Sequence, residues 1–260
     1  MNNGTKIFLK DLESRFNKLD EEWVNREYNQ ALQNLNLKIV VLDDDPTGVQ
    51  TVHGVSVYTD WSEESISSGF AEENSLFFIL TNSRSFSQEK TTQVHREIAE
   101  LLVKVSQKTG RDFLVISRGD STLRGHYPLE TQVLRDTIEA ESGVVIDGEI
   151  IIPFFKEGGR LTVEDTHYVL KGEALIPAAE TEFAKDRTFG YSQSHLGNWI
   201  QEKTASKYKA GDVEYISLQT IREMDYEQIE KQLHRVTDFQ KVVVNALEYS
   251  DLKLFMVALA

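Results

Sequence analysis

The most constraining feature of this sequence is a repeated alternation of short apolar runs with segments of helical periodicity. LKIVVL at 37–42 and DFLVIS at 112–117 are short, rich in branched side chains and followed by polar loops, as buried parallel strands are. Between such runs, residues 88–108 place apolar side chains at spacings of three and four, which predicts a helix. This alternation predicts an α/β fold: a mostly parallel sheet with helices on both faces, in a Rossmann-like three-layer arrangement.

Other segments continue the alternation. Between 161 and 192 the pattern weakens, which indicates an excursion of short elements. Residues 8 to about 35 have the apolar spacing of one amphipathic helix. We therefore interpret 1–35 as an N-terminal helical extension and 36–260 as one α/β domain. The remaining predicted strands are 55–59, 75–81, one or two within 144–155, 213–218 and 241–247, and the remaining helices are 129–138, 195–206, about 225–236 and the C-terminal stretch YSDLKLFMVALA.

The charge balance narrows the class of partner. The chain has 28 Lys and Arg against 42 Asp and Glu, a formal net charge of -14. Such an acidic surface is a poor partner for nucleic acid or an anionic membrane. An acidic protein that binds an anion must place its few cations locally, so arginines beside small polar residues are informative.

Cysteine and long apolar segments are absent from the sequence. Without cysteine there can be no disulfide, thiolate nucleophile or thiolate-ligated metal. No run reaches the 18 or so apolar residues of a membrane span, and the N-terminus lacks the apolar stretch of a signal peptide. We expect a cytoplasmic protein.

Polar clusters follow three of the predicted strands, where parallel sheets bind ligands. The first is Asp43–Gly48, with the sequence DDDPTG. Adjacent carboxylates can accept hydrogen bonds from sugar hydroxyls, act as a base or hold Mg²⁺. The alternative is an ordinary turn, because Asp, Pro and Gly are common turn residues.

The second cluster is Thr81–Arg84, after SLFFIL. Arg84 could grip a ligand carboxylate through two parallel hydrogen bonds, and Asn82 and Ser83 could contact hydroxyl groups. A helix N-cap followed by a surface arginine would look the same.

The third cluster is Ser117–His126, with the sequence SRGDSTLRGH. Two arginines, Arg118 and Arg124, stand among small hydroxyl residues, and the glycines let ligand atoms approach the backbone. Solvation alone is a poor explanation for so many donors after a buried strand. The alternative is a surface pair of Arg118 with Asp120, with Ser and Thr as caps.

Two further basic segments carry weaker signals. Arg160 ends the loop EGGR, which could equally be a tight turn, and Lys185 and Arg187 lie within TEFAKDRTFGY. The histidines show no HExxH-like spacing, so a protein-built zinc site is not predicted, and GxSxG, Walker A and GxGxxG motifs are missing.

Taken together, DDDPTG, TNSR, GDSTLRGHYPLE, PFFKEGGRLT and TEFAKDRTFGY occur in the order found in the four-carbon acid sugar kinase family, which the chain resembles over about 37–250. Many members have a Lys-containing lead-in to the third motif and Asn in place of His126. The resemblance implies ATP-dependent phosphorylation of threonate, erythronate or 3-oxo-tetronate acids by a protein of two α/β domains. The N-terminal domain holds the acid and the C-terminal domain the nucleotide.

Only the N-terminal domain is resembled here. We therefore expect ATP and Mg²⁺ to belong to the full-length enzyme, with neither bound tightly by this chain alone. The expected partners are a small sugar acid and a nucleotide-binding domain, in the same chain or a separate one. The oligomeric state stays open, with a homodimer as one candidate.

The resemblance also implies roles for individual residues. Arg84 and Arg124 would grip the acid, and Asp44 and Asp45 are the catalytic candidates, one of which would orient or deprotonate the accepting hydroxyl. No residue is predicted to ligate a metal. The substrate-binding candidates are Thr47, Gly48, Asn82, Ser83, Arg84, Asp120, Ser121, Arg124, Gly125, His126 and Arg160.

Four alternatives to an active kinase domain stay open at this point. The chain could be a sugar-acid-binding module that never catalyses, an inactive truncated kinase, or a metal-assisted hydrolase that uses the aspartate cluster. It could also be a structural protein with a vestigial site. The sequence identifies neither the particular acid nor the hydroxyl that would be phosphorylated.

Overall fold

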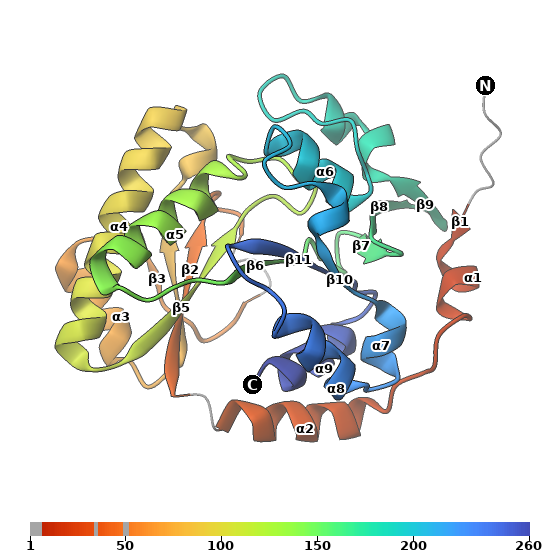
Figure 1. Ribbon diagram of the computed structural model, residues 1–260, viewed down its shortest axis with the longest axis horizontal. Coiled ribbons are helices and arrows are strands. Elements are labelled where there is room, and N and C mark those ends of the chain that lie inside the picture. The colour runs from red at the N-terminus through yellow and green to blue at the C-terminus, as the bar shows by residue number, and fades with distance from the viewer. Residues whose placement is uncertain (1–6, 34–35, 49–51) are drawn as a thin grey trace. The chain divides into compact units, whose positions relative to one another are not determined.

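The computed structural model describes residues 7–33, 36–48 and 52–260 (Figure 1). Its internal contacts divide the chain into two compact units. Unit 1 comprises Met1–Leu35, Ser121–Leu123 and Asp147–Ala260, and unit 2 comprises Asn36–Asp120 and Arg124–Ile146. The chain thus divides near residue 146, where the sequence marked no boundary.

Unit 2 is built on a four-stranded parallel sheet with the strand order β3-β4-β2-β5. The register pairs Asp43, the last residue of β2, with Leu80 of β4 and with Arg118 of β5. The carboxyl ends of three strands are therefore level at one edge. The strands are β2 (Leu37–Asp43), β3 (Val57–Tyr58), β4 (Leu76–Leu80) and β5 (Asp112–Arg118).

Three helices of unit 2 pack on this sheet: α3 (Glu63–Ala71), α4 (Gln88–Thr109) and α5 (Leu129–Ser142). Side chains alternate between the two faces of a strand, so Val40 and Phe77 reach the same core as Ile98 of α4. The predicted helix 88–108 is confirmed almost to the residue. It starts at Ser87, whose hydroxyl accepts the Lys90 N–H, and it stops at a glycine in the left-handed conformation.

Unit 1 contains a second parallel sheet, of strand order β10-β11-β6, with β6 (Gly148–Ile151), β10 (Glu214–Ile216) and β11 (Gln240–Val244). One face, with Val242 and Ile216, packs on helices that include α8 and α9. Tyr215 points to the other face, where its hydroxyl packs against Gly197 of α6. This sheet is thus covered on both faces. The helices of this part of unit 1 are α6 (Leu196–Lys203), α7 (Leu218–Arg222), α8 (Tyr226–Leu233) and α9 (Tyr249–Leu259).

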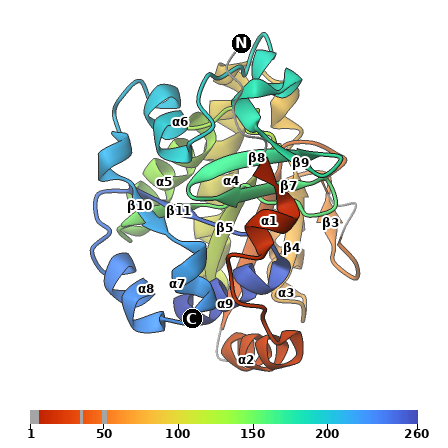
Figure 2. The same ribbon diagram turned by 90° about the vertical axis from the view of Figure 1, so that its right-hand side faces the viewer.

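The weakly patterned excursion of the sequence is an antiparallel sheet in unit 1 (Figure 2). Its order is β1-β9-β8-β7. Glu164 and Asp165 both have positive φ, as the two central residues of a tight hairpin require. The strands are β1 (Ile7–Phe8), β7 (Arg160–Val163), β8 (Thr166–Lys171) and β9 (Ala174–Pro177), and short 3₁₀ turns follow at η2 (Ala178–Glu180), η3 (Glu182–Lys185) and η4 (Ala210–Asp212).

The α/β class with parallel sheets is confirmed, but two details of the sequence prediction are wrong. The predicted single sheet is two parallel sheets and an antiparallel one. The single helix predicted from residue 8 is two helices, α1 (Leu9–Glu13) and α2 (Glu21–Gln33). Asp20 separates them, because its carboxylate accepts the N–H groups of Glu22 and Trp23 and so starts a new helix.

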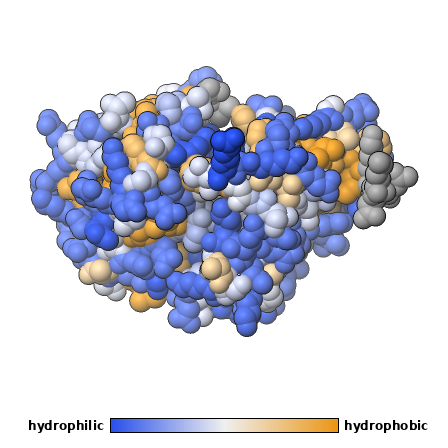
Figure 3. Space-filling view, turned by 90° about the horizontal axis from the view of Figure 1, so that it is seen from above, coloured by the Kyte–Doolittle hydropathy of each residue, from blue (hydrophilic) through white to orange (hydrophobic). Residues whose placement is uncertain are grey.

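Figure 3 shows a face dominated by hydrophilic side chains, on which the apolar patches are small and separate. None of the helices in the described ranges combines the length and apolar character needed to cross a membrane.

Candidate functional site

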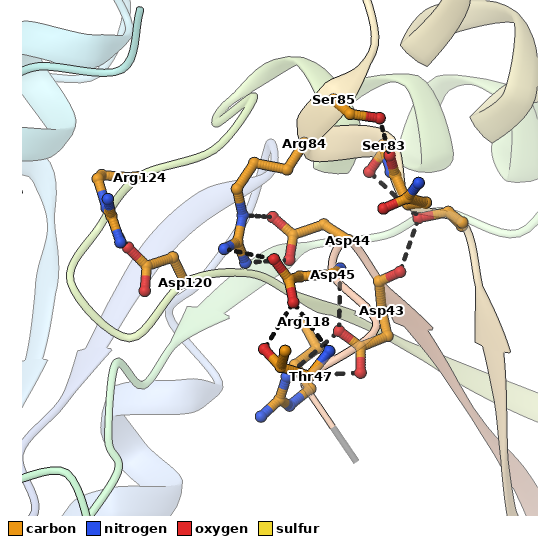
Figure 4. Close-up of polar contacts among 12 residues, drawn as sticks. Asp43, Asp44, Asp45, Thr47, Ser83, Arg84, Ser85, Arg118, Asp120 and Arg124 are labelled. Atoms are coloured by element: carbon orange, nitrogen blue, oxygen red, sulfur yellow. Dashed lines mark hydrogen bonds and ion pairs between the residues drawn. The ribbon is translucent and has the colours of Figure 1, made fainter. Parts of the chain in front are cut away.

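The three polar clusters predicted from the sequence follow β2, β4 and β5, whose ends are level at one edge of the sheet in unit 2. Asp43 ends β2 and Arg118 ends β5, while the turn η1 (Ser83–Ser85) follows β4 and carries Arg84. Figure 4 shows their side chains converging in pairs of opposite charge. The parallel register therefore assembles one arginine–aspartate cluster from distant parts of the sequence.

Arg84 bridges two neighbouring carboxylates. It donates from Nε to Asp44 Oδ2 at 2.9 Å, from Nη2 to Asp44 Oδ1 at 2.6 Å and from Nη1 to Asp45 Oδ2 at 3.1 Å. The Asp44 side chain is 3% exposed and that of Arg84 is 24% exposed. Burial raises the pKa of Asp44 to about 6, because the loss of hydration outweighs the hydrogen bonds from Arg84.

Asp45 is more exposed than Asp44 and has a different environment. Its Oδ1 accepts the Thr47 hydroxyl at 2.6 Å and the Thr47 N–H at 2.8 Å. These hydrogen bonds lower the pKa of Asp45 below its ordinary value. Asp45 is therefore the carboxylate of the cluster that stays ionised while remaining within reach of solvent.

The second arginine–aspartate pair joins β5 to β2. Arg118 Nη1 lies 3.2 Å from Asp43 Oδ1, and the Asp43 side chain is 1% exposed. Gly48 leaves the space for this pair: a Cβ at position 48 would lie 1.9 Å from Asp43 Oδ2 and 2.0 Å from Arg118 Nη1. Burial raises the pKa of Asp43, although Arg118 opposes the shift.

The third pair lies within the loop after β5, where Arg124 Nε donates to Asp120 Oδ2 at 2.5 Å. Gly125 adopts φ of +149°, and a Cβ there would lie 3.6 Å from Asp44 Oδ2. The loop therefore passes close to the Asp44 carboxylate and adds Asp120 and Arg124 to the same cluster.

Two predicted ligand contacts have other roles. Ser83 is fully buried and its hydroxyl donates to Glu130 at 2.6 Å. His126 is 7% exposed, and its Nε2 lies 3.1 Å from the Phe86 carbonyl oxygen. Both side chains hold the loops in place, whereas Asn82 is exposed, with positive φ at the start of η1.

Ser121 and Arg160 belong to unit 1, so the structure does not add them to the cluster of unit 2. The Ser121 carbonyl oxygen lies 2.7 Å from Nε2 of the buried His167. The next carbonyl, of Thr122, accepts the Tyr191 hydroxyl at 2.8 Å. Arg160 begins β7, donates to the Gly158 carbonyl and lies over the Phe183 ring.

Residues 39–260 match the family model described as a sugar-binding N-terminal domain. The chain belongs to this family. The match confirms, for the N-terminal domain, the resemblance carried by the sequence motifs.

Solved structures of the DUF1537 family share the fold of this sugar-binding domain. Two crystal forms of a Bordetella bronchiseptica protein, both domain-swapped dimers with bound citrate, match with TM-scores of 0.58 and 0.59 at 19% identity. They are matched over 83% and 85% of this chain and 49% and 51% of theirs. A Haemophilus influenzae protein matches with a TM-score of 0.57 at 14% identity, over 84% of this chain and 55% of its own.

The sugar-binding domain thus spans about half the length of these neighbours. No functionally curated protein matches the chain.

The sequence places Asp43 and Arg118 within the predicted polar clusters, but neither is among the predicted catalytic or substrate-binding residues. The alternative of a surface pair joined Arg118 to Asp120, whereas the structure pairs Arg118 with Asp43. Glu130 was missed as well, although it ends the motif GDSTLRGHYPLE, because only the fold brings it against Ser83. Asp43 and Arg118 directly follow the two predicted strands 37–42 and 112–117, and aligning the ends of these strands would have placed the two side chains together.

The cluster does not resemble a metal centre. Within the described ranges, no group of three or more His, Asp or Glu side chains is arranged to hold a metal ion. Each of the four aspartates bonds an arginine instead. These four carboxylates are therefore paired with arginines, an arrangement that does not fit Mg²⁺ at this cluster.

Proposed function

We propose that this domain binds a four-carbon sugar acid at the arginine–aspartate cluster of unit 2, as the substrate-binding part of an ATP-dependent kinase. The observation that carries the proposal is the set of three arginine–aspartate pairs at adjacent strand ends of a sugar-binding domain. Arginines offer planar donors for a carboxylate, and aspartates accept hydrogen bonds from hydroxyl groups. A hydroxylated acid needs both.

Arg84 is the principal candidate for gripping the acid. Its three bonds to Asp44 and Asp45 use three of the five N–H donors that an arginine carries. The pairing fixes its orientation before the ligand arrives, which reduces the entropy cost of binding. The citrate bound by the Bordetella neighbour, itself a hydroxylated acid, supports this ligand class.

Asp45 is the candidate for orienting or deprotonating the accepting hydroxyl. Its pKa is lowered and its side chain is 27% exposed, so it is an ionised acceptor that a ligand can reach. Phosphoryl transfer depends mainly on positioning the hydroxyl and stabilising charge. Asp44, buried and held by Arg84, would serve as the rigid support of this arrangement.

ATP and Mg²⁺ would be bound by a separate nucleotide-binding domain, and the combined protein would work in the cytoplasm, where ATP is available. Because the carboxylates here do not fit Mg²⁺, no step assigned to this chain involves a metal. The length of the DUF1537 neighbours, about twice the matched region, supports a second domain.

Calorimetric titration of the chain with threonate, erythronate, 3-oxo-tetronate and citrate tests the binding. We expect heat with at least one tetronate, and loss of that heat in Arg84→Lys but not in Ser85→Ala. The absence of heat with every acid would overturn the proposed function and favour a vestigial site.

The kinase assignment has a separate test. We expect the 260-residue chain alone to show negligible ATP-dependent phosphorylation of the acid that it binds, and addition of the matching nucleotide domain to produce turnover. Robust phosphorylation by the chain alone would contradict the assignment. Binding without turnover after addition of the nucleotide domain would favour a binding module. The domain-swapped dimers of the neighbours also suggest a homodimer, which light scattering would detect.

A further inference from the structure

A buried polar network lies directly behind the turn that carries Arg84. Ser83 Oγ donates to Glu130 Oε1 at 2.6 Å, and the same carboxylate oxygen lies 3.7 Å from His95 Nε2. Ser83, Glu130 and His95 are 0%, 6% and 1% exposed. They come from η1, α5 and α4, so the network ties the Arg84 turn to two helices of unit 2.

The hydrogen bond of His95 to the backbone defines its tautomer. His95 Nδ1 lies 2.9 Å from the Thr91 carbonyl oxygen, which can only accept, so Nδ1 carries a proton. Burial lowers the pKa of His95, which favours the neutral ring. The other ring nitrogen, Nε2, packs against Glu130 at 3.7 Å, a separation longer than a hydrogen bond.

Removing one member of such a buried network costs folding free energy. An unpaired buried carboxylate or imidazolium loses its hydration without compensation. The network is completed on the other side by Thr81, whose hydroxyl lies 2.9 Å from the Asp43 carbonyl oxygen and 3.1 Å from Ser83 Oγ. It therefore links the end of β2, the turn after β4 and both helices.

The arrangement is not that of a hydrolase. In a nucleophilic site the serine hydroxyl bonds a histidine that can take its proton. Here the partner of Ser83 is a carboxylate, and the histidine lies beyond it. Ser83 is also fully buried, so no substrate reaches its oxygen.

We propose that Glu130 and His95 are positioning residues of the acid site, which together hold Ser83 and thereby fix Arg84 in the orientation that receives the ligand. Neither residue touches the ligand. The effect on ligand affinity rests on the proposed function, whereas the effect on the orientation of Arg84 does not.

The first experiment follows the environment of the Arg84 side chain by NMR in the absence of any ligand. In the full chain, the Arg84 Nε–H is held by Asp44 and should give a distinct, slowly exchanging ¹H–¹⁵N resonance, assigned by its loss in Arg84→Lys. We expect this resonance to broaden or shift in Ser83→Ala and Glu130→Ala. Ser85→Ala is the matched control, because the exposed Ser85 hydroxyl lies on the same turn and bonds only the Asn82 carbonyl among the described contacts.

The second experiment measures affinity for citrate and for the best tetronate. Because a lost buried hydrogen bond to a charged group weakens an interaction about 10-fold or more, we expect about 10-fold weaker binding in Ser83→Ala and Glu130→Ala. Glu130→Gln should restore binding to within about 3-fold, because its amide oxygen can still accept the hydrogen bond from Ser83. A residue with a merely structural role would lower stability without this rescue.

Each outcome bears on one proposal. An unchanged Arg84 resonance in Ser83→Ala and in folded Glu130→Ala overturns the positioning role. If Glu130→Ala fails to fold, the Arg84 resonance in Ser83→Ala and in Glu130→Gln tests the positioning role instead. If the wild-type chain binds no acid, the proposed function fails, and the Arg84 resonance alone decides the positioning role.

Discussion

At the scale of single residues, the site depends on arginines that are already paired before any ligand binds. Burial of Asp44 favours its neutral form, while Arg84 favours the ionised one, and the two effects oppose each other across hydrogen bonds of 2.6 and 2.9 Å. Arg84 is 24% exposed, and its three hydrogen bonds to Asp44 and Asp45 define the orientation of its guanidinium. The geometry of the guanidinium therefore matters as well as its charge.

We expect Arg84→Lys to keep the positive charge and to lose the planar pair of parallel N–H donors. A lysine cannot bond Asp44 through two parallel hydrogen bonds, so acid affinity should fall about 10- to 100-fold, the range for hydrogen bonds to charged groups. Calorimetry with citrate measures this change. Affinity within 2-fold of the wild type would exclude Arg84 from the binding site.

The raised pKa of Asp44 predicts a pH dependence of stability. Because its folded pKa of about 6 exceeds the ordinary value of 3.8, Asp44 contributes stability below about pH 4, and this contribution is lost as the pH rises through 6. The loss is of order 3 kcal/mol. Relative to Asp44→Asn, the wild type should therefore become less stable between pH 4 and 7 in urea unfolding. A constant difference between the two proteins would contradict the shift.

Gly48 should not tolerate a side chain. The Cβ of Gly48→Ala would collide with Asp43 and Arg118, so we expect a loss of about 1–3 kcal/mol in unfolding free energy. Gly211→Ala is the control, since a Cβ there meets nothing within 4 Å. Equal stability of the two variants in chemical denaturation would show that position 48 has free space.

At the scale of elements, capping residues decide where helices begin, and this is where the N-terminal prediction failed. The apolar spacing continues through residues 14–20, yet the chain leaves the helix there and re-enters it at α2. Periodicity reports which side chains are apolar, whereas a cap such as Asp20 reports where the backbone starts a new set of hydrogen bonds.

We therefore expect Asp20→Ala to destabilise unit 1 by about 1 kcal/mol, since the N–H groups of Glu22 and Trp23 lose their acceptor. Asp20→Asn retains an acceptor and should be close to the wild type. Thermal unfolding followed by circular dichroism compares the two. An alanine variant as stable as the asparagine variant would show that the cap contributes nothing.

At the scale of the whole molecule, the chain forms two compact units, and the proposed site lies in one of them. Trp61 is in unit 2, whereas Trp23 and Trp199 are in unit 1. A ligand stabilises the species that binds it by RT ln(1 + [L]/Kd). An acid that binds the proposed site, present at 100 times its Kd, should therefore add about 2.7 kcal/mol to the unfolding free energy of unit 2.

Variants with tryptophan left only in one unit separate the two transitions. We expect the acid that binds best in the calorimetric titrations to raise the unfolding midpoint reported by Trp61 in Trp23→Phe/Trp199→Phe. The midpoint reported by the unit 1 tryptophans in Trp61→Phe should move less. A larger shift in unit 1 would place the binding site outside the arginine–aspartate cluster.

Apolar periodicity and strand-end polarity are local properties, so the sequence alone predicts the α/β class, most strand positions and the three polar clusters. The division into two parallel sheets and an antiparallel one, and the burial of Ser83 and His126, are visible only in the packed molecule. The same is true of the pairing of Arg118 with Asp43 and of the hydrogen bond from Ser83 to Glu130. Burial and pairing partners depend on strand register and on contacts between residues far apart in the chain, which no local pattern contains.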